Sequence, residues 1–422
     1  MMGGMTKAST MTRTGRRVRV LAVVGLLLTA INLRPAVTSL GPVLEEVRAS
    51  LGMSAAVAGL LTSVPAVCFA LVGVMAPRLA RRWGTSAAIA LGAAALVVGL
   101  AVRPFAGGTG SFIALTALAL AGIALANVLL PVVVKERFPD RVGAMTGLYS
   151  VALNLGASTA AAVTVPLTGA FGGDWRFGLG VWALIAATAL PAWIMLARSH
   201  TGSAATMAAA TAPAPATAPA TVAVESAEIR GAGLRLRRNP IAWALAVYFG
   251  LQSTAAYVIM GWLPQVFRDA GLSASTAGLL FAVTALLGVP LSFVLSALAG
   301  RLPRQSGIAV GIGLFGIAGY AGLWVDPAAA PWLWAFLLGV ANCSFPLVLT
   351  MIAMRGRDAA TVVRLSAFAQ STGYLLSIPG PIVVGALYEH SGSWEIPLGL
   401  LALLMVPQMV AGFLAGRDRQ IG

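Results

Sequence analysis

Apolar runs of similar length recur along the whole chain, and they constrain its fold more than any other feature. Each is close to the ~20 residues that an α-helix needs to cross the hydrocarbon core of a bilayer, and much longer than a membrane-barrel strand. Hydrophobic residues make up 59% of the 422 residues and charged residues only 10%, which excludes an ordinary soluble globular protein. We therefore expect an all-α membrane protein embedded in a lipid bilayer.

Twelve of these runs predict transmembrane helices. Between the sixth and the seventh, residues 198–238 are rich in Ala, Pro and Thr and end in a basic LRLRR segment, which predicts a disordered cytoplasmic linker. We therefore expect six-helix lobes at 20–197 and 239–415, with cytoplasmic tails at 1–19 and 416–422. The expected helices are Val20–Gly41, Ala55–Ala76, Ser86–Val102, Ser111–Val134, Val142–Phe171, Trp175–Ala197, Ala242–Leu263, Ser275–Ala299, Ile308–Val325, Trp332–Met354, Val362–Leu387 and Trp394–Ala415.

The net charge of +15 follows from topology rather than from a nucleic-acid partner. With the amino terminus inside, the cytoplasmic segments hold 23 of the 28 Lys and Arg residues, and Arg34 lies within the first helix. This asymmetry is the positive-inside rule, and it predicts a plasma (inner) membrane protein with both termini in the cytoplasm. The outer loops hold Arg48, Arg103, Arg176 and Arg268.

The two predicted lobes resemble each other in sequence. Gly41–Leu61 reads GPVLEEVRASLGMSAAVAGLL, and Gly261–Leu280 reads GWLPQVFRDAGLSASTAGLL, which match with one gap. Asn127 and Asn342 each precede a proline by four residues, at corresponding places in the two halves. Duplicated units of this kind predict the two-lobed architecture of secondary transporters, with a binding site between the lobes near the middle of the membrane.

Arg34 is the charged residue that we do not assign to a loop or a tail. It stands in LTAINLRPAVTSLGP, within the first apolar run. An arginine near the middle of a transmembrane helix costs roughly 2.5–3.5 kcal/mol on insertion scales, so such residues usually face a cavity or the protein interior. Pro35 follows directly and leaves the carbonyl of Ile31 without its helical donor, which predicts a kink. We expect Arg34 to anchor the substrate; the alternative is a structural role, with local thinning of the bilayer around it.

The remaining candidates for substrate binding are uncharged polar residues within the predicted helices. Thr38 lies one helical turn beyond Arg34, and Gln370 and Tyr374 share one helix face. For the asparagines, a packing hydrogen bond to a neighbouring helix is an equally good interpretation. The candidates besides Arg34 are Thr38, Asn127, Tyr149, Asn154, Gln252, Tyr257, Asn342, Gln370 and Tyr374.

Several kinds of chemistry are absent from the sequence. No carboxylate falls within a predicted helix, which weakens a side-chain proton relay, although Glu45, Glu46, Glu389 and His390 at the outer helix ends are able to titrate. An anionic solute could enter with a proton carried on itself or on Glu45 or Glu46. Neither lysine lies in a phosphate-binding loop, and neither histidine has metal-ligand neighbours. We expect no enzyme activity, no cofactor and no metal, and no disulfide from the two cysteines.

Motifs along the chain resemble those of the major facilitator superfamily across nearly the whole length. PRLARRWGTS is similar to the signature G-x-L-A-D-R-x-G-R-R, although Arg81 replaces its acidic residue and Thr85-Ser86 replace its basic pair. NLRPAVTSLGPVL, NVLLPVVVK, AQSTGYLLSIPGP and SGSW resemble the cyanate and nitroimidazole transporter branch. This resemblance implies alternating access and transport of a small anionic or polar organic solute. The alternatives are a membrane sensor built on the same scaffold and a drug or solute efflux transporter.

Overall fold

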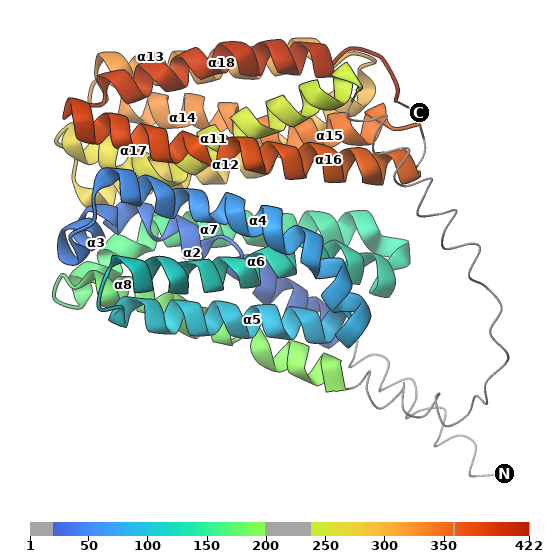
Figure 1. Cartoon of the computed structure of the whole chain (residues 1–422), viewed down its shortest axis with the longest axis horizontal. Coiled ribbons are helices and arrows are strands. Elements are labelled where there is room, and N and C mark those ends of the chain that lie inside the picture. The colour runs from blue at the N-terminus through green and yellow to red at the C-terminus, as the bar shows by residue number, and fades with distance from the viewer. Residues whose placement is uncertain (1–19, 199–237, 358, 422) are drawn as a thin grey trace, which may run out of the picture.

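The computed structural model describes residues 20–198, 238–357 and 359–421, and within these ranges the chain is helical apart from turns and one isolated bridge between Gly356 and Ile421. Figure 1 shows two stacked layers of helices, with the first half of the chain in the lower layer and the second half in the upper one. Eleven helical segments in the described part are long and apolar enough to cross a membrane. The expected all-α membrane architecture is confirmed. The predicted linker and the first tail lie outside the described residues.

The first layer begins with a helix over residues 20–32 and ends with a helix over residues 190–198. In between lie α2 (Pro35–Thr38), η1 (Gly41–Val43), α3 (Leu44–Leu51), α4 (Ala55–Trp83), α5 (Thr85–Val102), η2 (Arg103–Phe105), α6 (Thr109–Arg137), η3 (Pro139–Arg141), α7 (Val142–Ala170) and α8 (Trp175–Ala187). The second layer contains α11 (Pro240–Asp269), α12 (Ala274–Arg301), α13 (Ser306–Val325), α14 (Pro331–Ala341), α15 (Ser344–Arg355), α16 (Ala359–Ser377), α17 (Pro379–Ser391) and α18 (Glu395–Ala415).

Proline explains the break in the eleventh expected helix. α16 and α17 lie end to end with the break at Ile378, and together they cover the predicted range Val362–Leu387. Pro379 has no N–H to donate to the carbonyl of Leu375, and this carbonyl accepts from the amide of Ile378 instead, at 3.4 Å. The tighter turn interrupts the helix without changing its direction.

The sequence repeat appears in the structure as equivalent local contacts. Ser54 caps α4 by accepting a hydrogen bond from the amide of Val57, and Ser273 caps α12 by accepting one from the amide of Thr276. Gly59 on α4 packs against the backbone of Pro381 in α17. The aligned residue of the second repeat, Gly278 on α12, packs against α7, where an added Cβ would lie 2.7 Å from the carbonyl oxygen of Ala161. Both glycines allow close helix contact between the two layers.

One end of the molecule, which we call the acidic end, joins the two lobes through charged side chains. It comprises α3, the start of α4 and the ends of α11 and α17. Arg268 of α11 forms ion pairs with Glu45 at 2.9 Å and with Glu46 at 3.0 Å, both on α3. Glu389 of α17 accepts a hydrogen bond from the amide of Ala56 at 3.0 Å. These contacts tie the first lobe to the second at this end.

We call the opposite end of the molecule, where α4, α6 and α12 end, the basic end. Arg78, Arg81 and Arg82 near the end of α4 are exposed there, as are Lys135 of α6 and Arg301 of α12. The described chain also starts and finishes on this side (Figure 1). Basic residues from both lobes therefore gather at this end, whereas Arg48 and Arg268 lie at the acidic end.

Candidate solute-binding site between the lobes

Arg34 lies at a break in the first helix, as Pro35 predicts. The helix ends after residue 32, and α2 begins at Pro35, so Arg34 stands in the connecting turn. Its side chain is half-buried. Its backbone carbonyl accepts from the amides of Val37 and Thr38, both at 3.0 Å, but its guanidinium has no hydrogen bond or ion pair with any residue that the structure describes. The positive charge of Arg34 therefore lies within an apolar segment, and its N–H donors have no partner among the described residues.

Two tyrosines of the second lobe lie near that guanidinium. The hydroxyls of Tyr257 on α11 and Tyr374 on α16 both lie within electrostatic range of Arg34, without a hydrogen bond to it. All three residues are candidates from the sequence, and they come from different lobes. The structure therefore brings them together at the interface between the lobes.

Aromatic rings surround Tyr374. Phe69 on α4 stacks with it at a centroid distance of 5.4 Å and an angle of 21°. Phe249 on α11 meets it edge-on, at 4.9 Å and 88°. Because Phe69 belongs to the first lobe, the stacked pair bridges the two lobes beside Arg34. Sequence reasoning missed both phenylalanines, since a phenylalanine inside an apolar run gives no signal that separates a cavity wall from a lipid-facing surface.

Two glutamines lie on the same helices as these tyrosines. Gln252 on α11 is only 4% exposed, and its Oε1 atom is buried without a hydrogen-bond donor among the described residues. Gln370 on α16 donates from Nε2 to the hydroxyl of Ser366 at 2.6 Å. A buried amide oxygen without a donor is costly, so Gln252 is suited to a ligand that donates a hydrogen bond.

Thr38 and Asn154 bond to their own helices. The Thr38 hydroxyl donates to the carbonyl of Arg34 at 3.1 Å, and Asn154 donates from Nδ2 to the carbonyl of Ser150 at 2.9 Å. The Oδ1 atom of Asn154 faces Gly288 of α12 across the lobe interface. These bonds lie within each residue's own helical segment and not across to a neighbouring helix, and they use the donors of both side chains, so these two residues stay weaker candidates for binding than Arg34.

Asn127, Tyr149 and Asn342 are all half-buried. Tyr149 on α7 packs against the apolar core of the first lobe. The two N-x-x-x-P motifs differ in structure: α6 continues through Pro131, whereas the second lobe has a break at Asn342 between α14 and α15. There the amide of Phe345 donates to the carbonyl of Asn342 at 3.3 Å, a shorter-range bond that tightens the turn.

The expectation that Arg34 alone stands outside loops and tails is wrong. Arg103, assigned to an outer loop from the sequence, is 0% exposed in η2, and Arg355 at the end of α15 is 2% exposed. Arg103 donates to the carbonyl of Ala36 at 3.0 Å. Arg355 donates to the carbonyl of Ala415 at 3.0 Å and to Oε1 of Gln305. Both guanidinium groups are buried because they satisfy acceptors that the helix ends leave free.

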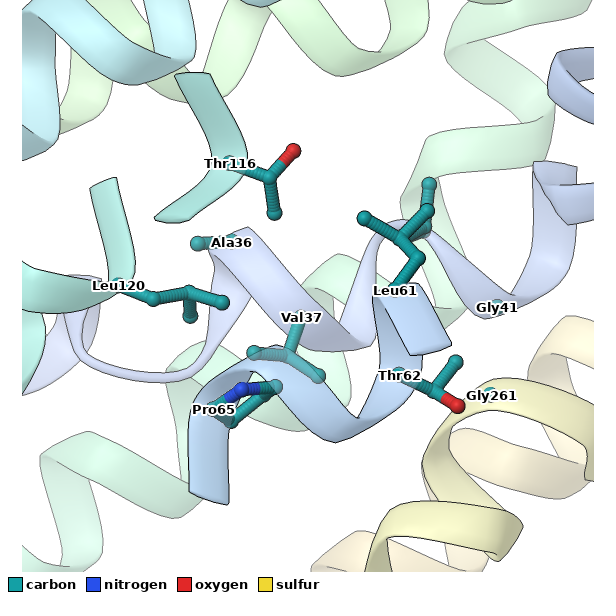
Figure 2. A pocket seen from close by; sticks show the side chains of 10 residues that line it. Ala36, Val37, Gly41, Leu61, Thr62, Pro65, Thr116, Leu120 and Gly261 are labelled. Carbon is teal, nitrogen blue, oxygen red and sulfur yellow. The ribbon is translucent and has the colours of Figure 1, made fainter. Parts of the chain in front are cut away.

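A small apolar hollow, with room for about one water molecule, lies beside the broken segment (Figure 2). Ala36 and Val37 line it from the first helix, and Thr116 of α6 contributes a buried hydroxyl without a partner among the described residues. Its other lining residues are Leu40, Gly41, Leu61, Thr62, Pro65, Leu120 and Gly261. The segment that follows Arg34 therefore borders a small hollow on the side of α4 and α6.

The described residues contain no group of His, Cys, Asp or Glu side chains that could hold a metal ion. Cys68 and Cys343 are both free and buried, on α4 and at the start of α15. Around Arg34, the polar chemistry between the lobes is therefore that of one guanidinium, phenol hydroxyls and amides.

Known proteins with similar sequences are membrane transporters. An uncharacterized transporter of Bacillus subtilis (strain 168), YycB, is 34% identical over 94% of both chains. The 2-nitroimidazole transporter of Escherichia coli (strain K12) is 32% identical over 96% of this chain and 97% of its own. The cyanate transport protein CynX of the same organism is 29% identical over 91% and 94%. The resemblance to this branch, inferred from NLRP and the other motifs, is confirmed.

The fold is also shared with solved transporters. A bacterial homologue of the human lysosomal transporter Spinster, in an inward-facing and unoccupied conformation, superimposes with a TM-score of 0.74 at 16% identity, over 96% of this chain and 98% of that one. The family model of the Major Facilitator Superfamily matches residues 23–381. The chain is therefore an integral membrane protein and not an enzyme, and it belongs to the Major Facilitator Superfamily of secondary transporters.

Proposed function

We propose that this protein transports a small anionic or polar organic solute, similar in size to cyanate or a nitroheterocycle, by alternating access about Arg34. The observation that carries the proposal is the unpaired guanidinium between the lobes, next to Tyr257 and Tyr374. A charge-assisted hydrogen bond to a solute would be stronger in this low-dielectric setting than in water. The cyanate and 2-nitroimidazole transporters among its relatives support this solute class.

The aromatic residues beside Arg34 suit a flat solute. Phe69 and Tyr374 come from different lobes and stack on each other. A rocking motion of the lobes would separate these rings, so a planar solute could contact an aromatic face while its polar group reaches Arg34. Tyr257 adds a second hydroxyl within electrostatic range of the same guanidinium.

The basic end supports a cytoplasmic location for both tails. Arg78, Arg81 and Arg82 lie at this end, and lysine and arginine near helix ends favour the inner side of the plasma membrane. With this orientation the acidic end faces outward, and the ion pairs of Arg268 close the transporter on the outer side.

Proton coupling would act at the acidic end. Protonation of Glu45 or Glu46 removes one of the charges that hold Arg268 of the other lobe, and this loss would favour opening on the outer side. Tyr388 does not provide this response, because burial, together with its hydrogen bond to Asp269 and the charge of Asp269, raises the pKa of Tyr388 to about 12. Its hydroxyl therefore stays protonated while carboxylates titrate.

Purified protein in liposomes tests the transport proposal. We expect uptake of labelled cyanate or 2-nitroimidazole by the wild-type protein and by Arg176→Ala, which changes a half-buried arginine at the start of α8. Arg34→Ala should be inactive at equal abundance in the membrane. Binding of either probe without uptake would favour the sensor, and movement from the cytoplasmic to the outer side in oriented vesicles would favour efflux. Uptake indifferent to an imposed pH gradient would remove the proton-coupling part alone.

A further inference from the structure

Arg103 contacts the segment of the first helix that carries Arg34. Its Nη1 atom donates to the carbonyl of Ala36 at 3.0 Å, and its Nη2 atom lies 3.5 Å from the hydroxyl of Ser39. It forms no ion pair with an acidic side chain among the described residues. A fully buried guanidinium without a counter-charge has a high desolvation cost. The structure therefore calls for a reason why an arginine occupies this position.

The break in the first helix leaves the backbone carbonyl of Ala36 without its helical donor, and Arg103 donates to this carbonyl. In a continuous α-helix the carbonyl of Ala36 would accept from the amide of Leu40. Here the amide of Leu40 donates to Val37 at 3.1 Å, because α2 ends in a tighter turn. The guanidinium of Arg103, reaching from η2, replaces the missing helical donor.

The backbone before Arg34 is held by few helical bonds as well. Pro35 has no N–H, and the amide of Leu33 makes only a short-range bond to Ala30 at 3.2 Å. The Arg34 guanidinium has no hydrogen bond of its own to a described residue. The direction in which Arg34 points is therefore set by the backbone of residues 33–40, and Arg103 bonds to that backbone two residues further on.

We propose that Arg103 is a positioning residue, which fixes the four-residue helix α2 and thereby aims the Arg34 guanidinium between the lobes. Its role in transport rests on the proposed function, because it acts on the solute only through Arg34. Its effect on the backbone does not depend on any solute. The two parts can therefore be tested apart.

A cysteine reporter tests the effect on the backbone. In full-length protein with Cys68 and Cys343 changed to alanine, Arg34→Cys is labelled with a water-soluble thiol reagent, alone and together with Arg103→Met. Loss of a hydrogen bond from a charged donor corresponds to about a tenfold change or more, so we expect the labelling rate to change by that factor. Arg103→Lys, which keeps the charge and one donor, should restore most of the wild-type rate. Arg176→Met is the matched control and should have no effect.

Tyr149→Cys on α7 serves as a second reporter and separates positioning from general loosening. We expect its labelling rate to be the same with Arg103 and with Arg103→Met. An unchanged rate at position 34 in the folded variant overturns the proposal, and so does an equal change at both reporters. If Arg103→Met does not fold, Arg103→Gln, which removes the charge and keeps a neutral donor, decides: a rate at position 34 identical to wild type, together with an unchanged KM for uptake, contradicts the positioning role.

Uptake measurements link this role to transport. In Arg103→Met, or in Arg103→Gln if that variant does not fold, we expect the KM for cyanate or 2-nitroimidazole to rise severalfold, while the maximal rate per molecule in the membrane stays close to wild type. A purely structural role would instead lower abundance and leave KM unchanged. Wild-type protein that transports neither probe, with the labelling change still present, would refute the proposed function and leave the positioning of Arg34 intact.

Discussion

Arg34 lies in the break of the first helix, and Arg103 bonds to the backbone next to it. The two guanidinium groups nevertheless differ in their partners. Arg103 is fully buried and donates to the carbonyl of Ala36, an acceptor that the break leaves free. Arg34 is half-buried, and its guanidinium has no hydrogen-bond partner among the described residues, only nearby phenol groups. Burial is costly for both arginines, so burial alone does not reveal the role of either. The hydrogen-bond partners of the guanidinium group do.

Arg355 at the basic end agrees with this distinction. It is buried, and it donates to the carbonyl of Ala415 and to Gln305, so its donors are used within the second lobe. Arg103 and Arg355 therefore act as ties between helix ends, whereas the donors of Arg34 are available to a solute. The following predictions test this difference.

The largest expected effect is that of Arg34→Ala compared with Arg103→Met. We expect Arg34→Ala to abolish uptake with a melting temperature close to wild type, because no described residue loses a hydrogen bond. Arg103→Met should lower the melting temperature, since a buried hydrogen bond from a charged group contributes about 1.5–3 kcal/mol. Thermal unfolding and uptake, both at equal protein amounts, check the pair. A strongly destabilised Arg34→Ala would erase the contrast.

Arg34→Lys should have the next largest effect. Lysine keeps the charge but loses the planar fork of donors, so we expect the KM for uptake to rise about tenfold. The melting temperature should not change. A variant as active as wild type would show that charge alone matters, and that the geometry of Arg34 does not.

Tyr257→Phe and Tyr374→Phe should have smaller effects. Each removes one hydroxyl beside Arg34 and keeps the ring, which for Tyr374 stacks on Phe69. A neutral hydrogen bond contributes about 0.5–1.5 kcal/mol, so solute binding should weaken roughly 2–10-fold in either variant. Equilibrium binding to purified protein measures this. No change in either variant would mean that Arg34 acts without the second lobe.

Thr38→Val should have the smallest effect. The Thr38 hydroxyl donates to the carbonyl of Arg34 and is buried, so it is not free to bind solute. We expect uptake within about twofold of wild type, because a local bond of this kind contributes little. A large rise in KM at unchanged stability would move Thr38 into the binding site.

The sequence was sufficient to predict the helices, the repeat and the break at Pro35, because long apolar runs and proline act through local rules. It did not reveal the burial of Arg103, since an arginine at the end of an apolar run resembles a loop residue. Its acceptor on Ala36 is made available by a break far earlier in the chain. Phe69 and Phe249 were missed for a similar reason, because only the packing of the lobes distinguishes a cavity wall from a lipid-facing ring.

The most direct test of the central claim is isothermal titration of purified wild-type and Arg34→Ala protein with cyanate and with 2-nitroimidazole. If Arg34 binds the solute between the lobes, the wild-type protein binds at least one probe, and Arg34→Ala binds it about 100-fold more weakly or not at all. Equal affinity in the two folded proteins, or no binding of either probe to the wild type, would contradict the account.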